Sequence, residues 1–172
     1  MAAVVVLGPD GSPREQVTSI VPCDFPYIPG LLTFREGPAL LAAFEQIRKP
    51  DLIIFDGQGI AHPRGLGLAA HMGVLLDVPS VGCAKSRLCG DHGPLGRAKG
   101  STAPLLLDGR EVGVLLRTRD GVKPVYVSPG QYVSVEDSAR AVLDLASGYR
   151  LPEPTRLAHR AVTLLRKEAI RG

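Results

Sequence analysis

The order of apolar and polar positions in the first half of the chain predicts alternating strands and helices. Residues 2–7 (AAVVVL) form an apolar run with β-branched residues in its middle, and residues 15–23 alternate weakly. The turn sequence GPDGSP separates these two segments, which predicts a hairpin. Apolar residues within residues 31–49 recur at helical spacing before Pro50, which predicts a helix. Residues 51–56 (DLIIFD) form a continuous apolar run, which is typical of a central parallel strand.

The same kind of pattern continues along the rest of the chain, on both sides of a long polar loop. A short helix is expected at residues 68–76, and a glycine-rich loop at residues 86–104. Two apolar segments flank Asp108-Gly109, which is the strongest signal for a short hairpin in the chain. The other predicted elements are strands at residues 78–84, 103–107, 111–117 and 123–127, a helix at residues 135–146 between the N-cap Ser134 and the stop Gly148, and a final helix capped by Thr155. This order predicts one α/β domain over residues 1–172, with helices packed on a mixed sheet.

The composition is that of a globular protein and excludes several other classes. The chain has 172 residues, of which 45% are apolar and 22% charged, so one folded domain is expected rather than a disordered or fibrous chain. No apolar run approaches the ~20 residues that span a bilayer, and the first residues lack the basic segment of a signal peptide. The three cysteines have no framework spacing and favour a reducing compartment. We therefore expect a cytoplasmic protein without a membrane partner.

The charges are distributed unevenly along the chain. Residues 1–86 carry a net charge of −2 and residues 87–172 carry a net charge of +5. Fifteen of the twenty basic residues are arginines, whose planar fork of N–H donors matches phosphate. The basic half therefore suits a polyanionic partner, although a solvated basic face is the favoured interpretation on charge alone.

Two acidic residues and one lysine are the main candidates for chemistry. Asp56 ends an apolar strand and precedes Gly57 and Gly59, in the place where open α/β sheets bind their ligands. Glu36 lies near the start of the first predicted helix, where it could equally interact with the helix dipole. Two such carboxylates can hold Mg²⁺ through oxygen ligands. Lys85 follows the next strand and could stabilise negative charge there, or could be an ordinary surface lysine.

Two histidines and a proline-rich segment are further candidates. His62 lies in a glycine- and proline-containing loop and suits proton transfer or a phosphate contact, whereas His159 lies on the final predicted helix and points to the site or to solvent. In the segment FPYIPG, two prolines bracket Tyr27 and Ile28 and stiffen the loop. Such a tip could wedge between base steps. On these residues alone, a proline turn with Tyr27 packed onto the domain is the favoured interpretation.

Taken in order, five segments of the chain resemble the endonuclease V family, whose members act on deoxyinosine. They are FPYIPGLLTFREGP, PDLIIFDGQGIAHPRGLGLAAHMG, VPSVGCAKSRL, VKPVYVSPG and LPEPTRLAH. The resemblance implies an RNase H-like fold and a nuclease that uses Mg²⁺, or Mn²⁺ as a substitute. It also implies recognition of hypoxanthine, as inosine in DNA or RNA. The implied cut lies on the 3′ side, one nucleotide beyond the lesion, and leaves 3′-hydroxyl and 5′-phosphate ends.

The resemblance also assigns roles to individual residues of this chain. It implies that Asp56 and Glu36 bind the metal ion, with Lys85, His62 and His159 as the other catalytic residues. The residues implied to form the strand-separating wedge and the base pocket are Pro26, Tyr27, Ile28, Pro29, Gly30, Leu32, Gly57 and Gly59.

One feature of the family has no counterpart in this sequence. The family carries another acidic residue on a first strand, which lies centrally between the strands that correspond here to AAVVVL and DLIIFD, and no matching Asp is present. We therefore expect an N-terminally incomplete domain in which those two strands have unpaired inner edges and cleavage is impaired. The alternative function is a non-catalytic inosine-binding protein that keeps Tyr27 and the pocket glycines. A generic RNase H-like nuclease is disfavoured because it does not require PYIPG. A monomer is expected.

Overall fold

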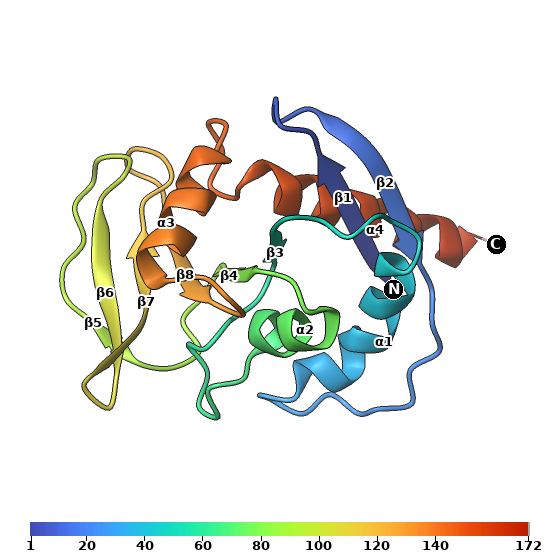
Figure 1. Ribbon diagram of the computed structural model, residues 1–172, viewed down its shortest axis with the longest axis horizontal. Helices are drawn as coiled ribbons and strands as arrows, with labels where there is room; N and C mark the ends of the chain where they lie inside the picture. Colours follow the sequence, from blue (N-terminus) through green and yellow to red (C-terminus); the bar gives the residue numbers. More distant parts are fainter. Residues whose placement is uncertain (172) are drawn as a thin grey trace.

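Two separate sheets and four helices make up the part of the chain that the computed structural model describes, residues 1–171 (Figure 1). The elements in chain order are β1 (Ala2–Leu7), β2 (Pro13–Ser19), α1 (Leu32–Phe44), β3 (Ile53–Phe55), α2 (Leu68–Leu76), β4 (Ser80–Ala84), β5 (Asp91–His92), β6 (Thr102–Leu107), β7 (Arg110–Leu116), β8 (Val125–Pro129), α3 (Val135–Asp144) and α4 (Glu153–Arg171). The predicted α/β class is confirmed.

The smaller sheet is the predicted N-terminal hairpin. Strands β1 and β2 pair antiparallel, with Ala2 opposite Ser19. Strand β2 ends at Ser19, four residues before the predicted end, because Ser19 pairs with Ala2, the first residue of its partner strand β1. The buried Ser19 hydroxyl donates a hydrogen bond to the Ala39 carbonyl, which fastens the hairpin to α1.

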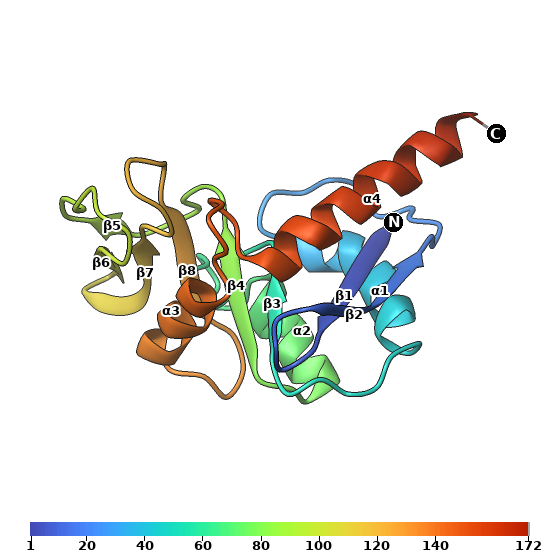
Figure 2. The ribbon, with the colours of Figure 1, turned by 90° about the horizontal axis from the view of Figure 1, so that it is seen from above.

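The larger sheet has six strands in the order β3-β4-β8-β7-β6-β5. Strands β3 and β4 are parallel, as predicted for DLIIFD, and the remaining neighbours are antiparallel. The central position that the apolar run favours is not observed: within residues 1–171 β3 pairs only with β4 and forms the edge, as expected for a domain that lacks the family's first strand. Strand β1 likewise pairs only with β2, so each strand has one unpaired edge, as expected. Helix α4 packs against both strands (Figure 2).

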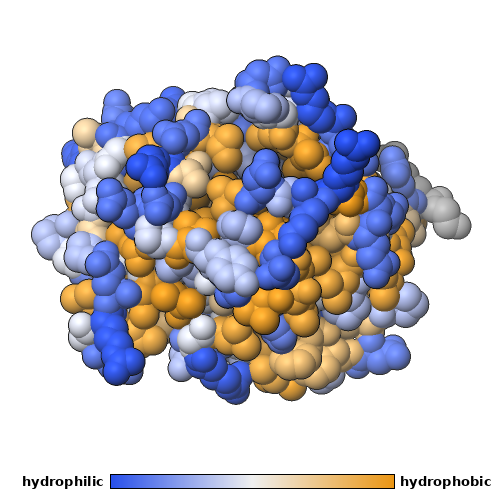
Figure 3. All heavy atoms as spheres, viewed as in Figure 1, coloured by the Kyte–Doolittle hydropathy of each residue, from blue (hydrophilic) through white to orange (hydrophobic). Residues whose placement is uncertain are grey.

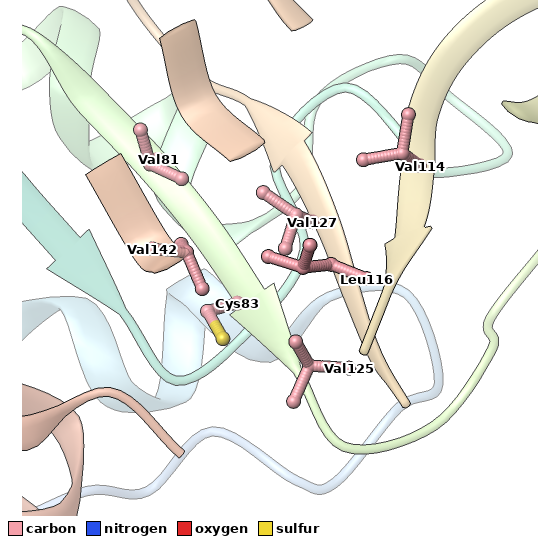
Figure 4. Packing of buried hydrophobic residues seen from close by; sticks show 7 residues of the cluster. All are labelled: Val81, Cys83, Val114, Leu116, Val125, Val127 and Val142. Carbon is pink, nitrogen blue, oxygen red and sulfur yellow. The ribbon is translucent and has the colours of Figure 1, made fainter. Parts of the chain in front are cut away.

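Alternating side chains of β3 and β4 build hydrophobic cores on the two faces of the sheet. Ile53 and Phe55 point to one face and pack with Met72 of α2. Val81 of β4 belongs to the other core, which Val142 of α3 closes. Figure 4 shows how the side chains of this second core converge from β4, β7, β8 and α3. Because both faces are covered, the ends of β3 and β4 are held firmly, and both candidate charged residues extend from these ends.

Several local predictions are confirmed residue by residue. Helix α2 has the predicted bounds, and the turn at Asp108-Gly109 joins β6 to β7 with positive φ at both residues, 51° and 75°. Both values fit a tight hairpin turn of the primed type. Ser134 caps α3 by accepting a 3.0 Å hydrogen bond from the Asp137 N–H. The predicted loop at residues 86–104 contains the two-residue strand β5, which pairs with β6.

The predicted cap of the last helix is wrong. Helix α4 begins at Glu153, two residues before Thr155, and Pro154 lies in its first turn, where a missing N–H is tolerated. Thr155 is buried, and its hydroxyl donates a 3.0 Å hydrogen bond back to the Pro152 carbonyl instead of accepting one from the helix.

The surface carries an apolar region over α2 and the adjoining part of α1 (Figure 3). Exposed apolar side chains of α1 and α2 include Phe34, Val74 and Leu75, and the exposed Leu66 precedes α2. Among residues 1–171, no helix combines the length and the apolar content that crossing a membrane requires.

Candidate active site

Asp56 and Lys85 meet at the carboxyl ends of two adjacent parallel strands. Asp56 directly follows β3, and Lys85 directly follows β4. The Lys85 Nζ donates to Asp56 Oδ2 at 2.6 Å, which leaves Oδ1 of the same carboxylate free for another partner. The side chain of Lys85 remains 38% exposed and that of Asp56 36% exposed, so a ligand can reach the pair. The predicted proximity of these residues is confirmed.

Glu36 lies within reach of the charge on Asp56. It is the fifth residue of α1 and remains accessible to solvent, although the protein crowds its carboxylate. Burial raises the pKa of the Glu36 carboxyl, and the negative charge of Asp56 raises it further, against the opposing charges of the Met1 amino group and Arg35. Two carboxylates that repel each other in this way would be stabilised by a cation between them.

The residues at this position fit part of a magnesium shell. Mg²⁺ takes oxygen ligands and commonly uses one or two carboxylates, with water and phosphate oxygens in the other positions. Asp56 and Glu36 supply two carboxylates of this kind. Within residues 1–171, no group of three His, Cys, Asp or Glu side chains is arranged to hold a metal ion, and metal binding by Asp56 and Glu36 stays a prediction.

His62 lies under the proline-rich loop. It is only 4% exposed, and its Nδ1 accepts a 3.1 Å hydrogen bond from the Arg64 backbone N–H. A Cβ added to Gly30 would lie 3.4 Å from its Nε2, so the ring packs against the end of that loop. Burial lowers the pKa of His62, which favours the neutral ring. In residues 1–171 no hydrogen bond joins its side chain to Asp56 or Lys85, so its described contacts support the loop.

His159 lies on α4, the helix that crosses β1 and β3. Its side chain is exposed to solvent. Its carbonyl accepts a 2.8 Å hydrogen bond from the Thr163 hydroxyl. Among the described residues, no hydrogen bond connects the ring of His159 to the three charged residues of the site, so its catalytic role stays a prediction.

The loop at residues 26–29 projects from the molecule. Tyr27 is 71% exposed and Ile28 is 41% exposed, so the interpretation that Tyr27 packs onto the domain is wrong. The loop turns back through Gly30, whose φ is +77°, a value that side chains other than glycine rarely adopt. The Gly30 carbonyl accepts a 3.2 Å hydrogen bond from Arg64 Nη1, which holds the base of the loop while its tip stays free.

A hollow of about 300 Å³ opens beside this loop. It is lined by Gly30, Leu31, Thr33, Phe34, Arg64, Leu66 and His71. Phe34 forms an aromatic cluster at its wall, with ring centroids 5.5 Å from Phe25 and 5.8 Å from His71. Leu32, predicted as a pocket residue, is partly buried against the core between α1 and α2.

The two predicted pocket glycines have structural reasons of their own. A Cβ on Gly59 would lie 2.0 Å from the Pro129 carbonyl oxygen, and a Cβ on Gly57 would lie 3.2 Å from Leu68. The Gly59 N–H also donates to the Ser128 hydroxyl at 2.7 Å. The Gly59 backbone therefore lies close against β8, and base recognition by either glycine stays a prediction.

Sequence reasoning missed two residues that contact the main chain after β4. Gln58 donates from Nε2 to the Ser86 carbonyl at 2.9 Å, and its buried Oε1 has no hydrogen-bond partner within residues 1–171. Arg150 donates to the Lys85 carbonyl from the segment between α3 and α4. A glutamine between two glycines at a strand end could have pointed to Gln58, whereas nothing local distinguishes Arg150 from the other arginines.

Comparisons with known proteins show the family of this chain. The family model described as Endonuclease V matches residues 1–160. Endonuclease V of Myxococcus xanthus is 54% identical over 157 residues, which cover 91% of this chain and 67% of that protein. The crystal structure of endonuclease V from Streptomyces avermitilis superposes with a TM-score of 0.92 at 44% identity, covering 98% of this chain and 75% of that one.

A more distant structure shares the fold and contains nucleic acid. Endonuclease V of Ciona intestinalis, in complex with a DNA containing an inosine followed by a ribo-adenosine, has a TM-score of 0.82 at 24% identity. It covers 96% of this chain, which spans 78% of that one. The family-model match spans residues 1–160, which include Asp56 and Lys85, and the chain belongs to the endonuclease V family, with its RNase H-like fold.

Proposed function

We propose that this chain is an endonuclease that cuts DNA or RNA on the 3′ side of a deaminated adenine, with inosine as the recognised nucleoside. The observation that carries the proposal is the Asp56–Lys85 pair at the ends of two parallel strands, beside Glu36. Membership of the endonuclease V family supports nuclease chemistry. The inosine-containing DNA bound to the Ciona protein of the same fold supports the class of substrate.

The proposed cofactor is Mg²⁺, with Mn²⁺ as a substitute, held by Asp56 and Glu36. The repulsion that raises the pKa of Glu36 supports a cation at this place. The chemistry that the ion supplies when bound is activation of water and neutralisation of charge on the phosphodiester. Replacing Mg²⁺ by Ca²⁺ should retain binding of nucleic acid and stop cleavage.

The residues of the chain itself are proposed to orient the substrate and stabilise charge. Lys85, held 2.6 Å from Asp56, stabilises the negative charge that develops on the phosphate oxygens. Tyr27 and Ile28 insert between bases from a loop whose base is fixed at Gly30. Neutral His62 holds that loop in place, and His159 approaches the phosphate from α4.

We propose that one more strand, carrying a third acidic residue, pairs with the unpaired edges of β1 and β3. The support is that each strand has one partner within residues 1–171 and that α4 packs against both. Translation of the DNA upstream of Met1 tests this proposal. An in-frame segment with an aspartate on an apolar strand would support it, and a stop codon or an unrelated sequence there would contradict it.

The alternative function is binding of inosine-containing nucleic acid without cleavage. It is favoured by the presence of two rather than three candidate metal ligands among the described residues. A nicking assay with Mg²⁺ on an inosine-containing duplex and on the matched RNA, beside a binding assay with Ca²⁺, separates the two functions. Cleavage that is lost in Asp56→Asn supports the nuclease. Tight binding without cleavage supports the alternative, and cleavage that survives Asp56→Asn refutes the role of the carboxylate.

We also propose that the protein is a monomer in a reducing compartment, the cytoplasm. The support is that Cys23, Cys83 and Cys89 are all free thiols in the structure. Size-exclusion chromatography with light scattering, with and without reductant, measures the oligomeric state directly.

A further inference from the structure

The hydrogen-bond ladder between β4 and β8 stops where the active site begins. Its last pair is Ala84 and Tyr126. Pro124, just before β8, has no N–H with which to extend the ladder. The carbonyl groups beyond the last pair therefore need other donors, and Lys85 is the first residue past the end of β4.

A single guanidinium group supplies these donors. Arg150 donates from Nη2 to the Lys85 carbonyl and, at 2.8 Å, to the Pro124 carbonyl. Its Nε donates to the Lys123 carbonyl at 3.1 Å. One half-buried side chain thus joins the end of β4 to the start of β8, and the planar fork of arginine can meet several acceptors at fixed angles, which a lysine cannot.

Arg150 is itself held in place from a third strand. The hydroxyl of Thr118, which is fully buried just after β7, donates a 2.6 Å hydrogen bond to the Arg150 carbonyl. The charge of the guanidinium group also acts on Cys83 of β4. Burial raises the pKa of the Cys83 thiol to about 12, and Asp56 raises it as well, while Arg150 and Lys85 both act in the opposite direction.

The main chain around Lys85 is fixed on its other side by Gln58. The Ser86 carbonyl accepts a 2.9 Å hydrogen bond from Gln58 Nε2, one residue beyond the carbonyl that Arg150 holds. From this clamped segment the Lys85 side chain extends to Asp56. A rotation of the backbone at Lys85 would move its ammonium group away from the carboxylate.

We propose that Arg150 is a positioning residue, which fixes the backbone of Lys85 so that the Lys85 ammonium group stays against Asp56. The inference rests on the proposed function for its catalytic consequence, whereas its geometric content is independent of it. The competing interpretation is that Arg150 only ties β4 to β8 for stability. The two differ in whether the loss of Arg150 acts through Lys85.

The first test measures Lys85 directly and needs no catalysis. The folded protein is treated with a limiting amount of an amine-acetylating reagent, and the acetylation rate of Lys85 is followed by peptide mass spectrometry. We expect the rate to rise several-fold in Arg150→Lys, because a lysine no longer held by the carboxylate is more reactive.

Arg117→Lys is the matched control for this measurement. Arg117 is also half-buried and also donates to loop carbonyl groups, at Gly96 and Val122, but it does not contact Lys85. Its replacement should leave the Lys85 rate unchanged. An equal Lys85 rate in wild type and Arg150→Lys, or an equal increase in both variants, overturns the proposal. If Arg150→Lys does not fold, Thr118→Val loosens only the anchor of Arg150 and should raise the rate by a smaller factor; no increase there counts against the proposal.

The second test uses cleavage of inosine-containing DNA in a double-mutant cycle. Arg150→Lys should lower kcat by about 10- to 100-fold with little change in KM, since small displacements of a catalytic group have effects of this size. In a Lys85→Ala background the same change should have almost no effect on kcat. Equal losses in both backgrounds overturn the proposal. If the chain cuts no substrate at all, the nuclease function fails, while the acetylation rate still decides the role of Arg150.

Discussion

The contact between Gly59 and β8 makes Gly59→Ala a sensitive probe of how the loop after β3 is held in place. An added Cβ would lie 2.0 Å from the Pro129 carbonyl oxygen and 2.7 Å from the Ser128 carbonyl oxygen, where heavy atoms are not tolerated below 3.0 Å. The loop must therefore move by roughly 1 Å away from β8.

That movement strains two buried hydrogen bonds. They are the 2.7 Å bond from Gly59 N–H to the Ser128 hydroxyl and the 2.8 Å bond from Ile60 N–H to the Pro129 carbonyl. Overpacking costs about 1–3 kcal/mol, and each weakened hydrogen bond costs about 0.5–1.5 kcal/mol. We expect a loss of about 3 kcal/mol in the free energy of unfolding, or about 6–12 °C in Tm for a chain of this size.

Urea unfolding of Gly59→Ala beside Gly93→Ala measures this loss. Gly93 is exposed, has no heavy atom within 4 Å of a built Cβ and does not have a positive φ, so its replacement should change the free energy of unfolding by less than about 0.5 kcal/mol. The same variant should also cleave more slowly, because the shifted loop carries Asp56 away from Lys85. A Gly59→Ala protein that unfolds at the same urea concentration as Gly93→Ala would refute the reasoning.

Three other predictions concern the site itself. Asp56→Asn should lower cleavage by at least about 100-fold while binding in Ca²⁺ persists, since a catalytic charge is lost from an exposed position; quantitative nicking and filter binding check this, and unaltered cleavage contradicts it. Tyr27→Ala should weaken binding to inosine-containing DNA by about 10- to 100-fold, with the free energy of unfolding changed by less than about 0.5 kcal/mol, because the ring is 71% exposed; fluorescence anisotropy and urea unfolding measure the two effects, and a large loss of stability would show that the ring packs on the protein after all. Because burial lowers the pKa of His62, the neutral ring is favoured on folding, so its contribution to stability is present above its ordinary pKa of 6.5 and is lost as the pH falls through the lower folded value. The difference in unfolding free energy between wild type and His62→Gln should therefore shrink from pH 7.5 to pH 5, and a difference independent of pH argues against a buried neutral His62.

The elements that could be predicted from the sequence depend on residues close together in the chain. Asp108-Gly109 forces the turn between β6 and β7 because both residues tolerate positive φ, and Ser134 caps α3 through an N–H three residues away. The same reasoning wrongly predicted that Thr155 caps the last helix. Its hydroxyl could cap a helix or donate to a nearby carbonyl, and only the start of α4 at Glu153 decides between the two.

The candidate site could be predicted in part for the same reason. Asp56 and Lys85 each follow an apolar strand, and parallel strands bring their carboxyl ends together, so the 2.6 Å contact follows from local patterns. The contact of Arg150 with the Lys85 carbonyl joins residues 65 positions apart, and no local sequence pattern predicts it. It depends on where the segment after α3 returns to the sheet.

The sequence by itself determined the α/β class, the endonuclease V family, and the acids and lysine that carry the proposed chemistry. Only the tertiary structure decided that Tyr27 is free and that His62 is buried under its loop. The physical reason is that a residue's type and local spacing set what it can do, whereas burial and pairing depend on neighbours from distant segments. The same FPYIPG segment could pack or project, and the same DLIIFD strand could be central or at an edge, according to what lies beside it.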